Sequence, residues 1–180
     1  ALNSPNYQEQ MQENMAAISN VFGGKKYLPS FDAYIPDGSA YAYASSHPNT
    51  KLLRQLYEKV DISVSGVGAL YPECDSALSN PLMAGDPAIS EFLQEQKPCG
   101  DILLRFFDQN GQECKVGHGV RVTAIEFDTY RKIPTKIVVA AGEKKARACI
   151  GAVRGGLVDV LIIDRPLAKK ILALWQEQEN

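Results

Sequence analysis

The stretch between Lys136 and Asp164 constrains the fold more than any other part of the chain. After Lys136 comes an unbroken apolar run over residues 137–141, which is typical of a strand buried on both faces. Apolar residues then recur at helical spacing as far as the pair Gly155-Gly156, which is a helix stop. Val158 to Ile163 is a second apolar run. This order predicts a βαβ unit with a right-handed crossover, whose two parallel strands are central and adjacent or nearly so.

The loop after the first of these strands faces the ligand side of the sheet in a βαβ unit, and the helix that follows offers free N–H groups to an anion. Here the loop contains Gly142 and ends in Lys144 and Lys145, with Arg147 behind them. Each cation in a first helical turn opposes the helix dipole at a cost of roughly 0.3–1 kcal/mol. A bound anion would explain these residues, and a solvated charge cluster relieved by Glu143 is the simpler alternative.

Hydrophobic periodicity and turn residues predict the remaining elements. Helices are expected over residues 9–22, 48–59, 86–95 and from 166 onward, with one or two turns over 39–45. Strands are expected over residues 26–28, 61–68, 101–108 and 119–125, with a return strand from 113 after an Asn-Gly turn at 110–111. Residues 69–85 are a long loop and a candidate lid. The pattern predicts an α/β fold with an open, mostly parallel Rossmann-like sheet and helices on both faces.

Composition excludes several classes of protein and site. The 180 residues fit one domain, and a net charge of −2 provides no basic face for nucleic acid. The sequence has neither a signal peptide nor an apolar run of membrane length. Its 4 cysteines lack CxxC spacing and its 2 histidines exclude a His-rich metal site. We therefore expect a cytoplasmic protein with reduced thiols, no metal and no cofactor.

Three blocks of sequence resemble the effector-binding domain of SorC-type bacterial transcriptional regulators. They are Gly100–Gly111, Val139–Ala146 and Arg154–Asp164. Two further features are similar in order and spacing: the strand over 61–68 that ends in Gly-x-Gly, and the first helix with Asn14. The resemblance covers nearly the whole chain.

The resemblance implies a fold similar to that of sugar-phosphate isomerases of the glucosamine-6-phosphate deaminase and ribose-5-phosphate isomerase kind. Family members bind a phosphorylated sugar, contact operator DNA through a separate module, and are usually dimers or tetramers. The present sequence lacks both that module and the family's first Rossmann-like strand with its Gly-Thr-Thr-type phosphate loop. We expect residues 1–180 to be an effector-binding domain without its N-terminal part.

The resemblance also implies the residues that bind the ligand. Lys145 matches the family's ligand-contacting lysine, Asp101 its acidic ligand residue, and Asn14 an amide-bearing position on the first helix. Gly142 lies in the ligand-facing loop. A lysine suits phosphate and a carboxylate suits sugar hydroxyls. Because both lie at element boundaries, Asp101 and Lys145 are expected at the same end of the sheet, close enough to share one ligand.

Two other functions stay open on the sequence alone. The first is a sugar-phosphate isomerase, in which Asp101 and Lys145 would act as acid and base, although nothing in the sequence singles out a proton-transfer pair. The second is an oligomerisation domain, which would account for the apolar core but not for the lysines of the loop.

Overall fold

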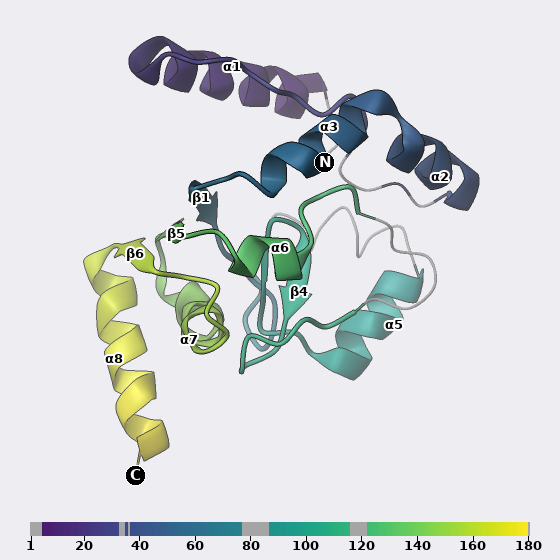
Figure 1. Ribbon diagram of the computed structural model, residues 1–180. Coiled ribbons are helices and arrows are strands. Elements are labelled where there is room, and N and C mark those ends of the chain that lie inside the picture. Colours follow the sequence, from purple (N-terminus) through teal and green to yellow (C-terminus); the bar gives the residue numbers. More distant parts are fainter. Residues whose placement is uncertain (1–4, 33–34, 36, 77–86, 116–121, 180) are drawn as a thin grey trace.

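Three helices begin the chain in the computed structural model, which describes residues 5–32, 35, 37–76, 87–115 and 122–179. They are α1 (Pro5–Phe22), α2 (Gly38–Ser46) and α3 (Pro48–Tyr57) (Figure 1). The predicted strand over residues 26–28 is wrong. The backbone of this segment forms hydrogen bonds with the Asn49 side chain and not with another strand. The Asn49 amide nitrogen donates to the Leu28 carbonyl at 3.0 Å, and Asn49 Oδ1 accepts from the Ser30 N–H at 2.9 Å.

The predicted βαβ unit is confirmed. Strands β1 (Ile62–Gly66), β5 (Thr135–Ala140) and β6 (Val160–Ile163) form a parallel sheet in the order β1-β5-β6. A short 3₁₀ turn, η1 (Glu143–Lys145), and helix α7 (Ala146–Arg154) connect β5 to β6. The two apolar runs are therefore adjacent strands. Only β5 is central, however, because β6 forms an edge of this three-stranded sheet.

The two faces of the parallel sheet differ. One face packs against α7 and α8 (Arg165–Glu179), and the core there includes Val138 and Ala140. The other face, which we call the open face, carries apolar side chains that are 42–67% exposed. They are Ile62, Val64, Val139, Val160 and Ile162. The prediction that both runs are buried on both faces is wrong.

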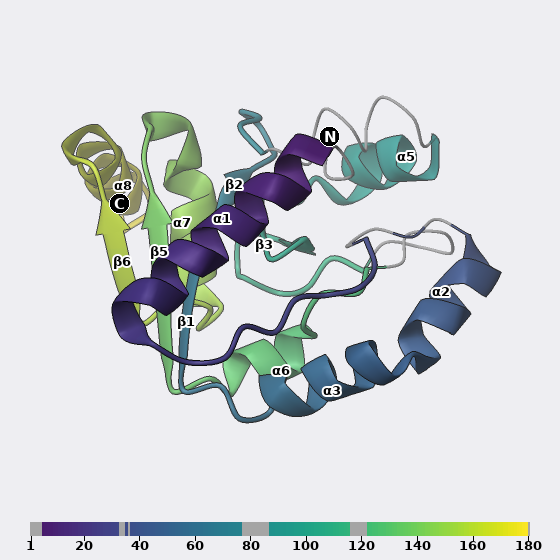
Figure 2. The same ribbon diagram turned by 90° about the horizontal axis from the view of Figure 1, so that it is seen from above.

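Helix α1 crosses in front of β1 and β5 when the molecule is seen from above (Figure 2). Its apolar residues nevertheless stay 58–83% exposed, namely Ile18, Val21 and Phe22. The expected helices on both faces are thus present, but among the described helices only α7 and α8 bury the sheet.

A second, antiparallel sheet begins where β1 ends. It contains β2 (Gly68–Ala69), β3 (Gly100–Ile102) and β4 (Arg105–Phe107) in that order. The predicted single strand over 101–108 is wrong, because Leu103 and Leu104 form a two-residue turn at positive φ (52° and 66°) and fold it into a hairpin. Two-residue hairpin turns usually contain Asn or Gly, so the two leucines gave no sequence signal for a turn.

The predicted Asn-Gly turn is present and directly follows β4. The Gly111 N–H donates to the Asp108 carbonyl at 2.9 Å, and a single bridge pairs Phe107 with Glu113. No return strand forms among residues 113–115, and the strand expected over 119–125 lies partly outside the described residues, as does most of the loop 69–85. Helices α5 (Pro87–Gln96) and α6 (Phe127–Arg131) contact this sheet through ring contacts of Phe92 with Phe106 and of Phe127 with Phe107.

The core lies between the parallel sheet, α7, α8 and the β3–β4 hairpin. Its largest fully buried side chains include Tyr130, Phe107, Phe127, Ile102, Leu157 and Leu167. The Tyr130 hydroxyl donates to the Leu157 carbonyl at 3.2 Å, which satisfies the one polar atom of that side chain. This core fixes α7, and with it the loop that precedes α7.

Candidate functional site

The carboxyl ends of β1, β5 and β6 meet at one edge of the parallel sheet, where open α/β folds collect their ligand-binding loops. The loop after β5 contains Gly142 and η1, and Asp164 follows β6. The chain after β1 passes directly into β2. Because Gly68 of β2 pairs with Asp101 of β3, the hairpin carries Asp101 to this edge.

Asp101 is a buried carboxyl group, with 7% of the residue exposed. The Ser76 hydroxyl donates to its Oδ1 at 2.6 Å. Burial raises the pKa of Asp101 to about 6, and the hydrogen bond from Ser76 and the positive charge of Lys145 partly oppose this rise. The carboxylate is therefore mostly ionised at neutral pH although it is little solvated.

Lys145 ends η1 and immediately precedes α7. Its charge lies close enough to lower the pKa of Asp101 and that of the Cys149 thiol, whose pKa burial raises to about 11. Within the described ranges its ammonium group makes no ion pair and no hydrogen bond. Lys145 thus carries an unpaired charge near a buried acid, and both residues lie at the same end of the sheet, as expected from their places at element boundaries.

Gly142 has a structural role at this edge of the sheet. Its φ of 95° is strained for any residue with a side chain, which explains the glycine. Its N–H donates to Asp164 Oδ2 at 3.2 Å, and Asp164 Oδ1 accepts from the Leu167 N–H at 3.0 Å. The carboxylate of Asp164 therefore ties the loop to α8. The Gly142 N–H is engaged and is not free for an anion.

Two residues of the site were missed from the sequence. Ser76 lies in an aperiodic loop, so nothing in the local pattern pointed to its contact with Asp101. Gly68 leaves room for that contact, because a Cβ atom there would collide with Asp101 Oδ1 and would lie 2.7 Å from Ser76 Oγ. The Gly-x-Gly at the end of the first strand was the available signal for Gly68.

Asn14 is not part of this arrangement. It is exposed on α1, and among the described residues no hydrogen bond links it to Asp101 or Lys145. Its role in ligand binding is a prediction from the resemblance alone.

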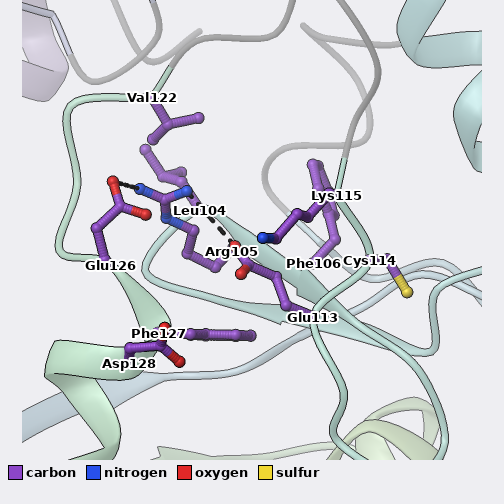
Figure 3. A pocket seen from close by; sticks show the side chains of 10 residues that line it. All are labelled: Leu104, Arg105, Phe106, Glu113, Cys114, Lys115, Val122, Glu126, Phe127 and Asp128. Atoms are coloured by element: carbon purple, nitrogen blue, oxygen red, sulfur yellow. Dashed lines mark hydrogen bonds and ion pairs between the residues drawn. The ribbon is translucent and has the colours of Figure 1, made fainter.

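A cavity of about 370 Å³ lies between β4, residues 113–115 and the segment that leads into α6, and neither Asp101 nor Lys145 lines it (Figure 3). Arg105 crosses this cavity, forming ion pairs with Glu126 at 2.6 Å and Glu113 at 3.5 Å. Its guanidinium also donates to the carbonyls of Ala124 and Ile125. Arg105 therefore connects segments of the chain. Because two glutamates already neutralise its charge, it is poorly placed to bind an anion.

The described residues contain no group of three or more His, Cys, Asp or Glu side chains that could hold a metal ion. In the same part of the chain, no helix is long and apolar enough to cross a membrane.

Comparison with known proteins identifies the family. A family model described as "Putative sugar-binding domain" matches residues 3–173, nearly the whole chain. The chain belongs to this family. The resemblance of the sequence blocks to SorC-type regulators is thereby confirmed.

Similar proteins are bacterial regulators. The chain is 34% identical over 80 residues (44% of the chain, 26% of the relative) to the deoxyribonucleoside regulator of Bacillus subtilis. It is 25% identical over 122 residues (68% of the chain, 38% of the relative) to the sorbitol operon regulator of Klebsiella pneumoniae. The crystal structure of full-length SorC from Klebsiella pneumoniae superposes with a TM-score of 0.70 at 22% identity, covering 79% of this chain and 45% of that one. This likeness confirms the α/β fold. The chain thus spans about a quarter to two fifths of the length of these curated relatives.

Proposed function

We propose that this chain is the ligand-sensing domain of a bacterial transcriptional regulator, and that it binds a phosphorylated sugar through Asp101 and Lys145. The observation that carries the proposal is the nearness of a buried carboxylate, Asp101, to the ammonium group of Lys145, which forms no ion pair within the described ranges, at the carboxyl edge of the sheet. Lys145 would hold the phosphate and Asp101 would accept hydrogen bonds from sugar hydroxyls. Relatives named as regulators of deoxyribonucleosides and of a sorbitol operon support a carbohydrate effector.

The remaining parts of the proposal follow from the family. Residues 1–180 form the effector-binding domain, and operator DNA is contacted by a module that these residues do not include. The protein acts in the cytoplasm as a homodimer or homotetramer. Asn14 on α1 would supply an amide to the bound sugar.

A thermal-shift screen tests the proposal. A sugar phosphate present at 100 times its dissociation constant should add about 2.7 kcal/mol to the free energy of unfolding. The panel should pair each hexose or pentose phosphate with its unphosphorylated parent sugar. We expect stabilisation by at least one phosphorylated member and little by its parent. Equal stabilisation by the two would exclude a phosphate contact, and no response across the panel would contradict a sugar-phosphate sensor.

One observation favours an enzyme as the second candidate. The pKa of Asp101, about 6, lies near the pH at which a general base works best. A sugar-phosphate isomerase needs such a base beside a carbon acid. Turnover assays with the sugar phosphate that binds best separate the two functions: measurable isomerisation that Asp101→Asn abolishes would favour the enzyme over the sensor.

A further inference from the structure

A second cleft, of about 530 Å³, lies between the segment after α5 and helix α7, and neither Asp101 nor Lys145 lines it. Its walls include Lys97 and Cys99 from the segment after α5, and Arg147 and Arg154 from α7. We call this space the basic cleft.

Positive charge dominates the basic cleft. Lys97, Arg147 and Arg154 line it, and among the described residues of its lining Asp108 is the only carboxylate. Asp108 is already engaged, since its Oδ1 accepts from the N–H groups of Asn110 at 2.8 Å and Gln112 at 2.9 Å. The Cys99 thiol adds no negative charge, because burial raises its pKa to about 12.

Two of these cationic residues occupy energetically unfavourable positions, one because of the helix dipole and one because of its backbone conformation. Arg147 is the second residue of α7, where the helix dipole opposes a positive charge, and it makes no ion pair with any described residue. Lys97 has a φ of 43°, which is unusual for a residue with a side chain. Its ammonium group lies 5.5 Å from the centre of the Tyr71 ring, at the rim of the cleft.

An apolar pocket of about 380 Å³ adjoins the basic cleft and shares Tyr71 and Lys97 with it. Its other walls include Leu70, Leu93 and Pro98. A ligand that crossed the shared rim would place one end among three cations and the other among apolar side chains.

We propose that the basic cleft and the adjoining pocket form a second ligand site, which binds a small organic anion with an apolar substituent. An arginine fork suits the oxygens of a phosphate or carboxylate, and Arg147 offers one to the cleft. Arg154, about two turns further along the same helix, lies with its guanidinium 5.3 Å from the centre of the Trp175 ring and contributes positive charge to the cleft wall. The apolar substituent would cover Leu93 and Leu70. This site is separate from that of the proposed sugar-phosphate effector.

Titration with hexyl phosphate, followed by NMR of the 180-residue chain, tests the proposal. We expect saturable binding with shifts at Tyr71, Leu93, Lys97 and Arg147. Methyl phosphate, which lacks the apolar tail, and hexanol, which lacks the anion, should each bind at least about tenfold more weakly. Arg147→Gln and Lys97→Gln should each weaken hexyl phosphate about tenfold.

Three control variants make the outcome decisive. Lys144→Gln removes a neighbouring charge outside the cleft, Val64→Thr changes the open face of the sheet, and Lys145→Ala changes the effector site. None of them should alter the affinity for hexyl phosphate by more than about twofold. Lack of saturation in the millimolar range, equal weakening by Lys144→Gln, or loss of binding in Lys145→Ala would each overturn the second site. The last two results would leave the effector proposal standing.

Discussion

Asp101 carries a carboxyl group whose surroundings act on it in opposite directions. Burial favours the neutral acid, whereas the Ser76 hydroxyl and the Lys145 charge favour the carboxylate. In a ligand complex, sugar hydroxyls would add hydrogen bonds to the carboxylate and so lower its pKa. The free domain therefore holds an under-solvated charge that a ligand can stabilise.

Replacing Asp101 with Asn should stabilise the free domain at neutral and alkaline pH. In the folded state the pKa is about 6, against 3.8 for an ordinary Asp, so ionisation costs the folded state more than the unfolded state. The favourable contribution of the neutral acid is full below pH 3.8 and is lost as the pH rises through about 6. Relative to its effect near pH 4, Asp101→Asn should gain about 2–3 kcal/mol at pH 8.

Urea unfolding of both proteins at several pH values measures this difference. Ser76→Ala provides the contrast, because loss of its hydrogen bond should raise the pKa of Asp101 further. A difference between Asp101→Asn and the parent chain that is the same at pH 4 and pH 8 would show that the carboxyl group has an ordinary pKa.

At the scale of single residues, the family resemblance pointed to Asp101 and Lys145 but not to their surroundings. Both lie within recognisable blocks at the boundaries of elements. Ser76, by contrast, contacts Asp101 from 25 positions away in a loop. A contact of this range depends on tertiary packing, which local periodicity does not encode.

The parallel sheet shows what an apolar run can predict about an element. Strands β5 and β6 and their parallel arrangement follow from composition and length, but the covering of each face does not. In β1 the alternation places Ile62 and Val64 on the open face, whereas the hydroxyl oxygens of Ser63 and Ser65 are buried without a hydrogen-bond partner among the described residues. Strand composition therefore predicted the pairing but not which face carries the core.

Matched substitutions on the two faces should differ strongly. Val138 is fully buried, so Val138→Thr puts an unsatisfied hydroxyl into the core and should cost about 1–3 kcal/mol. Val64 is 67% exposed, and Val64→Thr should change the free energy of unfolding by less than about 0.5 kcal/mol. Chemical denaturation of both variants checks the contrast. Similar losses would mean that the open face is covered in solution.

The turn after β4 is held against the end of α7 by a close approach of two glycines. A Cβ atom on Gly111 would lie 2.5 Å from the Gly151 carbonyl oxygen, and Gly155 would have to move as well. The φ of Gly111 is 72°. The Arg131 guanidinium, which donates to the Gly111 carbonyl at 2.8 Å, fixes the turn from the other side.

Gly111→Ala should therefore cost more than a simple backbone effect. Strain at positive φ and the collision with α7 together predict a loss of about 2–3 kcal/mol. Gly156→Ala is the matched control, because its φ of 66° is close to that of Gly111 but a Cβ atom there meets nothing within 4 Å. It should cost about 1 kcal/mol. Equal losses in thermal unfolding would show that the approach to α7 is looser than the structure has it.

Over the whole molecule, the order of helices and the βαβ unit were predictable because each has a strong local period. The division into two sheets was not, since it depends on Leu103 and Leu104 adopting a turn that their side chains disfavour. The meeting of Asp101 and Lys145 was predicted from a general rule about sheet edges. That rule works here because the antiparallel hairpin is joined to the parallel sheet at Val67 and Gly68.

The central claim is that Lys145 and Asp101 hold one phosphorylated ligand. The most direct test is the affinity of Lys145→Ala for the best sugar phosphate from the screen, measured by calorimetry beside Lys144→Ala, which removes the adjacent charge. Loss of a charge-assisted contact worth about 1.5–3 kcal/mol predicts a ten- to hundredfold weaker affinity for Lys145→Ala alone. The free energy of unfolding without ligand should change by less than about 1 kcal/mol. Unchanged affinity in Lys145→Ala, or equal weakening in both variants, would contradict the account.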